Sequence, residues 1–148
     1  MISKIDHIGV AVSNPEQALS IWSEGLGLEL EEIEDIASQK LRSYHLRVGE
    51  SHLELLHPTD PGSPIAKFLQ KKGDGIHHIA LAVDDISAMR DSLVKKGLEP
   101  LSEKPFVGAG GKQVLFFHPK TTGGVLLEIC QSGPVAECGQ AGKGKIDE

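Results

Sequence analysis

Two histidines and two glutamates occupy equivalent places in two halves of this chain. His7 stands third in the stretch Ile-Asp-His-Ile-Gly-Val-Ala-Val, and His78 stands third in Ile-His-His-Ile-Ala-Leu-Ala-Val. Glu54 and Glu128 each follow at a similar distance, inside a run of apolar residues. Self-similarity of this kind indicates a structural repeat. The four side chains are therefore candidates for one site to which two modules contribute.

These residue types in this pattern point to a metal centre. Imidazole and carboxylate ligands together suit a divalent ion such as Co, Zn, Ni, Mn or Fe(II), and four such ligands leave one or two positions for substrate or water. A single His or Glu in a strand is more often a hydrogen-bonded core residue or a solvated side chain. The match of all four positions across the repeat favours the metal. We therefore expect one divalent ion held by His7, Glu54, His78 and Glu128.

Further polar residues could join the same site. His45 has the strand parity of Ser43 and Arg47, so one of these three side chains could reach the same cavity. Cys130 is best interpreted as a small apolar filler. The four other histidines, His52, His57, His77 and His118, are best interpreted as structural residues.

The elements that must position these residues repeat as well. Each half is typical of a β-α-β-β-β module, with strands rich in β-branched residues and a helix that begins at an Asn or Asp cap and ends at Gly. In the first half the predicted elements are a strand over 5–12, a helix from Asn14 and Pro15 to Gly25, and strands over 28–35, 40–48 and 51–56. In the second half they are a strand over 76–83, a helix capped by Asp84 or Asp85 that ends at Gly97, and strands over 98–103, 113–118 and 124–131.

The predicted fold class is α+β, with two paired βαβββ modules that form a curved mixed sheet around the metal site. We expect a single domain over residues 1–148, because a chain of this length can bury one core. Glycine-rich loops over 108–111 and 121–124 would let the backbone approach a ligand closely. The parts of the domain are module one over 4–57, a linker over 58–74 with a short helix over 65–72, module two over 75–131, and a flexible tail over 132–148.

Composition excludes several classes of function. Hydrophobic residues make up 39% of the chain without an apolar run long enough to span a membrane, and the N-terminus has no signal segment. We therefore expect a cytoplasmic protein with no membrane partner. Cys130 and Cys138 alone imply neither a disulfide framework nor a thiolate metal site. The formal net charge of −6 disfavours nucleic-acid binding, which needs a basic surface.

Paired modules with a His and a Glu on equivalent strands resemble the vicinal oxygen chelate (glyoxalase) superfamily. Narrower motifs resemble the methylmalonyl-CoA epimerases of that superfamily, and the resemblance covers residues 4–131. Because glyoxalase I has a similar set of four ligands, the linker and the loops carry the narrower assignment. The motifs are Ser-Pro-Ile-Ala-Lys-Phe-Leu-Gln-Lys-Lys-Gly (63–73), Gly-Ile-His-His-Ile-Ala (75–80), Gly-Ala-Gly-Gly-Lys (108–112), and the run from His118-Pro-Lys to Gly-Gly-Val-Leu-Leu-Glu128.

The resemblance implies an isomerase that interconverts (R)- and (S)-methylmalonyl-CoA by metal-assisted transfer of the α-proton through an enolate. It implies that Glu128 is both a metal ligand and a base. It also implies that Ser43 stands where these epimerases have a second glutamate. The second proton carrier would then be Ser43 through a water, His45, or Glu54.

The resemblance also suggests partners. Lys112 and Lys120, beside the glycine loops, are expected to hold the anionic part of an acyl-CoA substrate. A homodimer is expected because symmetric dimers are the commonest soluble oligomers. The alternatives are a glyoxalase I-like lactoylglutathione lyase, an Fe(II) ring-cleaving dioxygenase and a metal-free ligand-binding module of the same fold.

Overall fold

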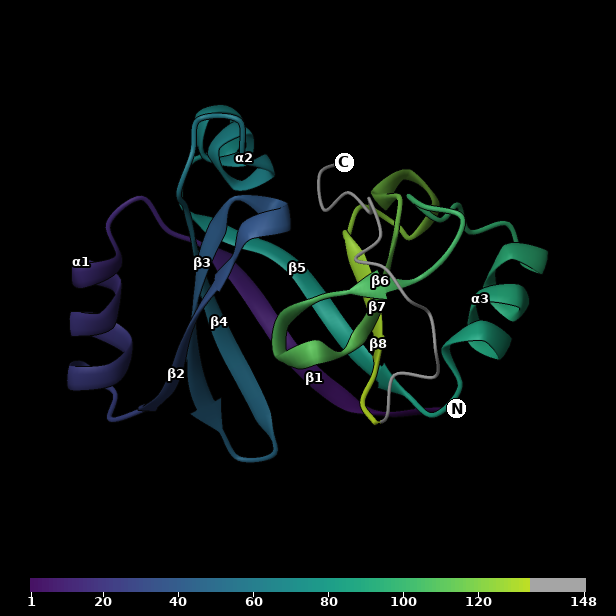
Figure 1. The fold of residues 1–148 in the computed structure, drawn as a ribbon, viewed down its shortest axis with the longest axis horizontal. Helices are drawn as coiled ribbons and strands as arrows, with labels where there is room; N and C mark the ends of the chain where they lie inside the picture. The colour runs from purple at the N-terminus through teal and green to yellow at the C-terminus, as the bar shows by residue number, and fades with distance from the viewer. Residues whose placement is uncertain (134–148) are drawn as a thin grey trace. The chain divides into compact units, whose positions relative to one another are not determined.

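The computed structural model describes residues 1–133, and these form two compact units. The first unit contains His7–His77. The second unit contains Met1–Asp6 and the described residues from His78 onward. Each unit consists of strands and helices (Figure 1), and the first and fifth strands of the chain contribute residues to both units.

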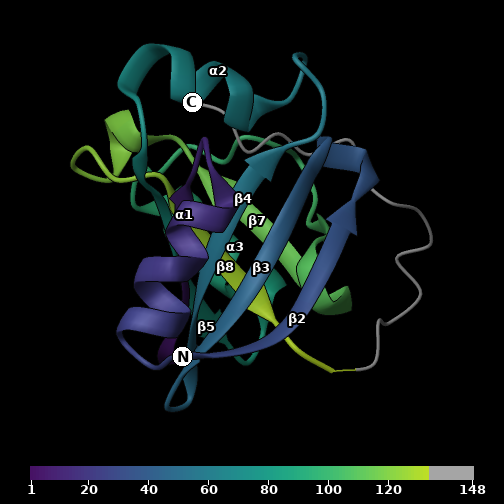
Figure 2. The same ribbon diagram turned by 90° about the vertical axis from the view of Figure 1, so that its left-hand side faces the viewer.

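The sheet of the first unit has the strand order β2-β3-β4-β1. β2 (Glu29–Ile36) and β3 (Leu41–Val48) are antiparallel, β3 and β4 (Ser51–Pro58) are antiparallel, and β4 runs parallel to β1 (Ile2–Ala11). Figure 2 shows β2, β3 and β4 side by side. The β3–β4 hairpin turns at Gly49, whose φ of 59° is accessible to glycine without the steric cost of a Cβ. The break predicted between the strands over 40–48 and 51–56 is confirmed.

The helix of the first unit begins where the sequence predicts. Asn14 caps α1 (Pro15–Leu19) by accepting a hydrogen bond from the N–H of Gln17 at 3.1 Å. The helix continues through a π-helical segment, Ser20–Gly25. It packs on the sheet and completes an apolar cluster. The buried members are Val12, Ala18, Tyr44, Leu46 and Leu55, with Val10, Leu19, Trp22, Leu28, Leu30 and Leu53 packed against them.

The predicted linker helix also belongs to the first unit. α2 (Pro64–Lys72) ends at Gly73, as predicted, and packs against the sheet. Phe68 on this helix meets the ring of His77 edge-to-face, with the ring centroids 4.9 Å apart. This contact fixes the helix to the beginning of β5 (Gly75–Val83).

The sheet of the second unit has the strand order β5-β8-β7-β6. β5 and β8 (Leu127–Gln131) are parallel, whereas β8 pairs antiparallel with β7 (Gln113–Phe117), and β7 with β6 (Phe106–Val107). Of the two predicted caps, Asp85 caps α3 (Ile86–Lys95) through a hydrogen bond of 3.0 Å to its first turn. The helix packs on an apolar cluster. Its buried members are Val83, Ile86, Leu115, Phe117 and Ile129, with Met89, Leu93, Leu98 and Leu127 packed against them.

The α+β class is confirmed in both units, because each combines a mixed sheet with helices. No helix within the described residues is long and apolar enough to cross a membrane.

Most of the predicted flexible tail lies outside the described residues, from residue 134 onward, and this part includes Cys138. Residues 1–133 also contain three 3₁₀-helices, at Ala37–Gln39, Ala109–Gly111 and Pro119–Thr121.

Three of the predicted strands differ most from the structure in extent. The first strand begins at Ile2 instead of residue 5. Residues 98–103 form no strand, and only Pro100 makes an isolated bridge, to the end of β7. Proline has no N–H to offer a neighbouring strand, so a regular ladder does not extend through it. The last strand begins at Leu127 instead of residue 124, because Gly123 and Gly124, with φ of 79° and 98°, first turn the chain.

Replacing Ser63 by alanine should lower the free energy of unfolding by about 1–3 kcal/mol. The Ser63 hydroxyl is fully buried, accepts from the N–H of Ile65 at 3.2 Å and donates to the carbonyl of Gln39 at 3.1 Å, and alanine loses both contacts. Denaturant unfolding measures the change. The exposed Ser38→Ala is the control and should change the free energy by less than about 0.5 kcal/mol. Equal effects of the two substitutions would contradict the prediction.

Candidate functional site

The first unit places His7 beside Glu54. β1 and β4 are parallel neighbours, and their register sets His7 opposite His52 and Gly9 opposite Glu54. Because side chains alternate along a strand, His7 and Glu54 share the face opposite to Val10, which packs in the apolar cluster under α1. Nδ1 of His7 lies 3.2 Å from Oε2 of Glu54, and the two residues are 5% and 6% exposed. The first unit thus brings these two candidate ligands together.

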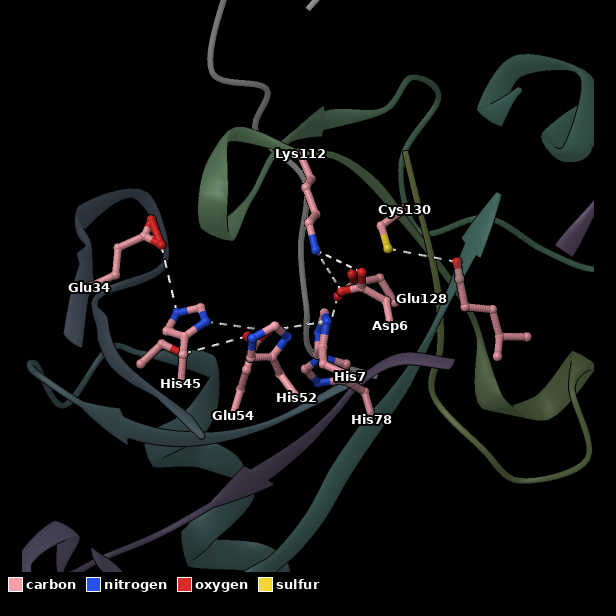
Figure 3. A network of polar contacts seen from close by, with 12 residues as sticks. Asp6, His7, Glu34, His45, His52, Glu54, His78, Lys112, Glu128 and Cys130 are labelled. Atoms are coloured by element: carbon pink, nitrogen blue, oxygen red, sulfur yellow. Dashed lines mark hydrogen bonds and ion pairs between the residues drawn. The ribbon is translucent and has the colours of Figure 1, made fainter. Parts of the chain in front are cut away.

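Two further side chains of the first unit face the Glu54 carboxylate. Oγ of Ser43 donates to Oε1 at 3.5 Å. Nδ1 of His45 lies 3.7 Å from Oε2, and Figure 3 shows this ring beside Glu54. Ser43 is fully buried and His45 is 9% exposed. Arg47, the third residue of the same parity, is exposed and pairs with Glu31 at 3.6 Å. Of the three candidates, Ser43 and His45 thus lie at Glu54 and Arg47 lies at the surface.

The second unit places His78 beside Glu128 in the same way. Nε2 of His78 lies 3.3 Å from Oε1 of Glu128, and each residue is 4% exposed. Phe116 lies opposite Glu128 on the neighbouring strand, and its ring meets the His78 imidazole edge-to-face at 5.3 Å. Cys130 is fully buried next to this pair along β8, and its thiol lies 3.7 Å from the carbonyl of Leu81. A buried His–Glu pair therefore occurs once in each unit.

The second unit also contains a buried carboxylate that the sequence analysis missed. Asp6 is 4% exposed and accepts two hydrogen bonds from Nζ of Lys112, at 2.7 Å to Oδ1 and 2.9 Å to Oδ2 (Figure 3). Lys112 directly follows the glycine loop over 108–111, so this ion pair fixes the loop to β1. A signal existed in the sequence, since a polar residue precedes the His of each repeat. The Lys112 ammonium, predicted to meet the substrate, is thus already engaged by a carboxylate.

Two of the remaining histidines contact backbone groups. Nδ1 of His57 lies 3.0 Å from the carbonyl oxygen of Val12. Nδ1 of His118 accepts a hydrogen bond from the N–H of Lys120 at 3.1 Å, which caps the last 3₁₀-helix. The side chain of Lys120, the second lysine predicted to meet an anionic ligand, lies at the surface.

Two surface ion pairs lower the pKa of the carboxylates in them. In the first unit, the Arg42 guanidinium donates to both oxygens of Asp35, at 2.7 Å and 3.3 Å, and these hydrogen bonds lower the pKa of Asp35. In the second unit, the N-terminal ammonium of Met1 donates to Asp84 at 2.6 Å and lowers the pKa of Asp84. Both pairs are solvent-exposed, so we expect them to contribute little to stability.

The two His–Glu pairs fit a divalent metal ion in donor type and in spacing. Imidazole nitrogens and carboxylate oxygens bind Zn-like ions at about 2.0–2.2 Å, so two of them on one ion at tetrahedral or octahedral angles lie roughly 2.9–3.5 Å apart. The N–O distances of 3.2 Å and 3.3 Å fall within this range. A bound cation would also offset the cost of burying each carboxylate. His7 with Glu54, and His78 with Glu128, are therefore suitable metal ligands.

Comparison with known proteins decides the family. The model of the Glyoxalase/Bleomycin resistance protein/Dioxygenase superfamily matches residues 6–116, most of the chain. The chain belongs to this superfamily. The resemblance found in the sequence is confirmed, and so is the glyoxalase-like fold class.

Within the superfamily, the chain is similar to methylmalonyl-CoA epimerases. The ethylmalonyl-CoA/methylmalonyl-CoA epimerase of Cereibacter sphaeroides is 41% identical over 133 residues, which are 88% of this chain and 99% of that protein. The mitochondrial methylmalonyl-CoA epimerase of Homo sapiens is 39% identical over 132 residues, 88% of this chain and 75% of that protein. A solved structure of the Streptomyces coelicolor methylmalonyl-CoA epimerase, in complex with 2-nitronate-propionyl-CoA, superposes with a TM-score of 0.86. The match covers 90% of this chain and 100% of that chain, and the two sequences are 33% identical.

The Asp6–Lys112 pair predicts a coupled effect on stability. Lys112→Ala should lower the free energy of unfolding by about 1–3 kcal/mol, because it removes the ammonium from a buried carboxylate. Adding Asp6→Asn to that variant should recover part of the loss, since the remaining group is then neutral. A double-mutant cycle by denaturant unfolding measures the coupling, with the exposed Lys104→Ala as control. Additive effects of the two substitutions would contradict the prediction.

Proposed function

We propose that the chain is a methylmalonyl-CoA epimerase, an isomerase that interconverts (R)- and (S)-methylmalonyl-CoA. The observation that carries the proposal is one buried His–Glu pair in each unit of a chain whose similar relatives are epimerases of this substrate. A fold hosts several chemistries, so the fold alone would not decide between them. The site and the relatives together favour proton transfer at the carbon next to a thioester.

The reaction sets the requirements for the site. Epimerisation removes a proton from one face of the carbon between a thioester and a carboxylate, and it returns a proton to the other face. It therefore needs one proton carrier for each face and stabilisation of the enolate oxygen. Glu128 is the carrier that we assign to one face, because its carboxylate is buried beside the imidazole of His78, whose ring packs on Phe116, so little water competes there.

We infer that His7, Glu54, His78 and Glu128 hold one divalent metal ion. The inference is supported by the equivalence of the two pairs in the repeat, by their donor types and spacing, and by membership of the superfamily. When bound, the ion supplies a Lewis acid for the substrate oxygens on which negative charge develops. Co, Zn, Ni and Mn all accept this set of nitrogen and oxygen donors.

The second proton carrier comes from the first unit in this proposal. Its candidates are Ser43 through a water, His45, and Glu54, and the first two both face the Glu54 carboxylate. A serine hydroxyl is a weak base, so Ser43 could act only by relaying a proton. An imidazole or a carboxylate can accept and return the proton itself.

The anionic part of the acyl-CoA is assigned to Lys120 and Lys112. Lys120 is exposed, whereas Lys112 would have to share its ammonium between Asp6 and a phosphate. Lys120 is therefore the better-supported of the two. A homodimer and a cytoplasmic location complete the proposal, and they rest on the frequency of symmetric dimers and on composition.

An assay with two substrates tests the function. The purified protein should convert a single stereoisomer of methylmalonyl-CoA into a mixture of both, measured by chiral separation after hydrolysis. It should leave the hemithioacetal of glutathione and methylglyoxal unchanged. Turnover of the hemithioacetal alone would favour a lactoylglutathione lyase, and turnover of neither substrate by metal-loaded protein would favour a ligand-binding module.

Replacing His78 by alanine should lower bound metal and epimerase rate together. Removing an outer contact to a ligand lowers metal affinity by roughly 10–100-fold, and losing a direct ligand should lower it by more. Metal content after dialysis, by mass spectrometry, and metal affinity, by calorimetry, measure the change. His77→Ala is the matched control, because the neighbouring imidazole packs on Phe68 instead. A His78→Ala variant with full metal content and full rate would refute the ligand assignment.

Replacing Glu128 by glutamine should abolish hydrogen exchange at the α-carbon from one stereoisomer of the substrate. The amide cannot accept the proton, whereas the carrier for the other face remains. Proton NMR of each stereoisomer in heavy water follows the exchange. The exposed Glu99→Gln serves as control and should exchange both isomers at the parent rate. Exchange of both isomers at the parent rate by Glu128→Gln would show that Glu128 carries no proton.

A further inference from the structure

Glu54 is contacted from two neighbouring strands in the first unit. On β1, Nδ1 of His7 lies 3.2 Å from Oε2. On β3, the hydroxyl of Ser43 donates to Oε1 at 3.5 Å, and Nδ1 of His45 lies 3.7 Å from Oε2. His45 stands directly opposite Glu54 in the antiparallel β3–β4 ladder. The two β3 residues therefore contact different oxygens of the same carboxylate.

Both β3 side chains are buried in a way that favours contact with Glu54. Ser43 is fully buried, and the hydrogen bond to Glu54 gives its hydroxyl a charged acceptor. Nε2 of His45, the nitrogen on the far side of the ring, makes no hydrogen bond to any described residue and lies 3.8 Å from a carboxylate oxygen of Glu34. The ring is thus held between two carboxylates, with Nδ1 toward Glu54 (Figure 3).

A ligand carboxylate needs such contacts to keep one orientation. Its two oxygens offer about four acceptor sites, so groups outside the metal's own ligands can fix which oxygen faces the ion. The distances of 3.5 Å and 3.7 Å are longer than strong hydrogen bonds, and contacts of this kind commonly shorten when a site is loaded.

We propose that Ser43 and His45 are positioning residues that hold the two oxygens of Glu54 and act on the reaction through that carboxylate. This inference rests on the proposed function, because it assumes that Glu54 serves as a metal ligand. It assigns Ser43 and His45 a role in metal affinity in place of direct proton transfer to the substrate.

The affinity for Co²⁺, measured by competition with a chromophoric chelator, tests the assignment without substrate. Ser43→Ala and His45→Leu should each weaken Co²⁺ binding by roughly 10–100-fold, the range for outer contacts to a ligand. His45→Asn should restore affinity to within a few-fold of the parent, because its amide nitrogen takes the place of Nδ1. His45→Gln, whose amide takes the place of Nε2 instead, should bind Co²⁺ as weakly as His45→Leu.

A histidine of similar surroundings supplies the matched control. His52 lies on β4 and, like His45 on β3, faces a carboxylate of β2, with Nε2 3.5 Å from Oε2 of Glu31, but it is partly exposed. His52→Leu should leave Co²⁺ affinity unchanged. Near-ultraviolet circular dichroism of each variant confirms that it is folded, and His45→Asn keeps the test decisive if His45→Leu fails to fold.

The outcomes separate this inference from the function on which it rests. The positioning role would be overturned if Ser43→Ala and His45→Leu both bound Co²⁺ as tightly as the parent protein but had a reduced epimerase rate. If His45→Leu does not fold, equal Co²⁺ affinity of His45→Asn and His45→Gln would have the same meaning. Either result would assign these residues to proton transfer. A parent protein that binds Co²⁺ and follows the predicted order of variants but does not epimerise methylmalonyl-CoA would refute only the proposed function. A parent protein that binds no Co²⁺ would overturn the inference.

Discussion

A carboxylate buried beside an imidazole, once in each unit, is the interaction on which the rest of the structure depends. An ionised carboxylate at 4–6% exposure costs several kcal/mol of lost hydration unless a polar or charged group compensates it. In both units the compensation has the same construction, because a His on one strand and a Glu on its parallel neighbour share one face. The opposite face of each sheet is apolar and covered by a helix. Strand alternation thus separates the core from the chemistry.

The pairs His7–Glu54 and His78–Glu128 could be predicted because they depend on two properties that a sequence records. The repeat identifies equivalent positions, and the period of two along a strand decides which side chains share a face. The hairpin at Gly49 and the helix caps could be predicted for a similar reason, since local residue chemistry determines them. The hairpin and the caps each depend on a short stretch of chain, whereas the two pairs depend on the repeat.

Three features could not be predicted from the repeat and from the period of two along a strand. The ion pair of Asp6 with Lys112 joins residues 106 positions apart, and neither residue carries a local sign of its partner. Strand parity made Ser43, His45 and Arg47 equal candidates, and only the end of β3 at the hairpin puts Arg47 at the surface. Periodicity also overestimated the strand at 98–103, where an apolar pattern is present but the missing N–H of Pro100 prevents a regular ladder. The ion pair depends on a distant contact, whereas in the other two cases a local feature, the hairpin or the proline, overrides the strand period.

The central claim is that the equivalent pairs of the two modules bind the same metal ion. X-ray absorption of the protein loaded with one equivalent of Zn²⁺ tests it most directly, because the multiple-scattering signal of imidazole counts the histidines on the ion. The account predicts two imidazoles per ion with nitrogens at about 2.0–2.1 Å, together with oxygen ligands and no sulfur. It also predicts that one imidazole remains in His7→Ala and one in His78→Ala. A single imidazole per ion in the parent protein would contradict the claim, since each pair would then bind metal by itself.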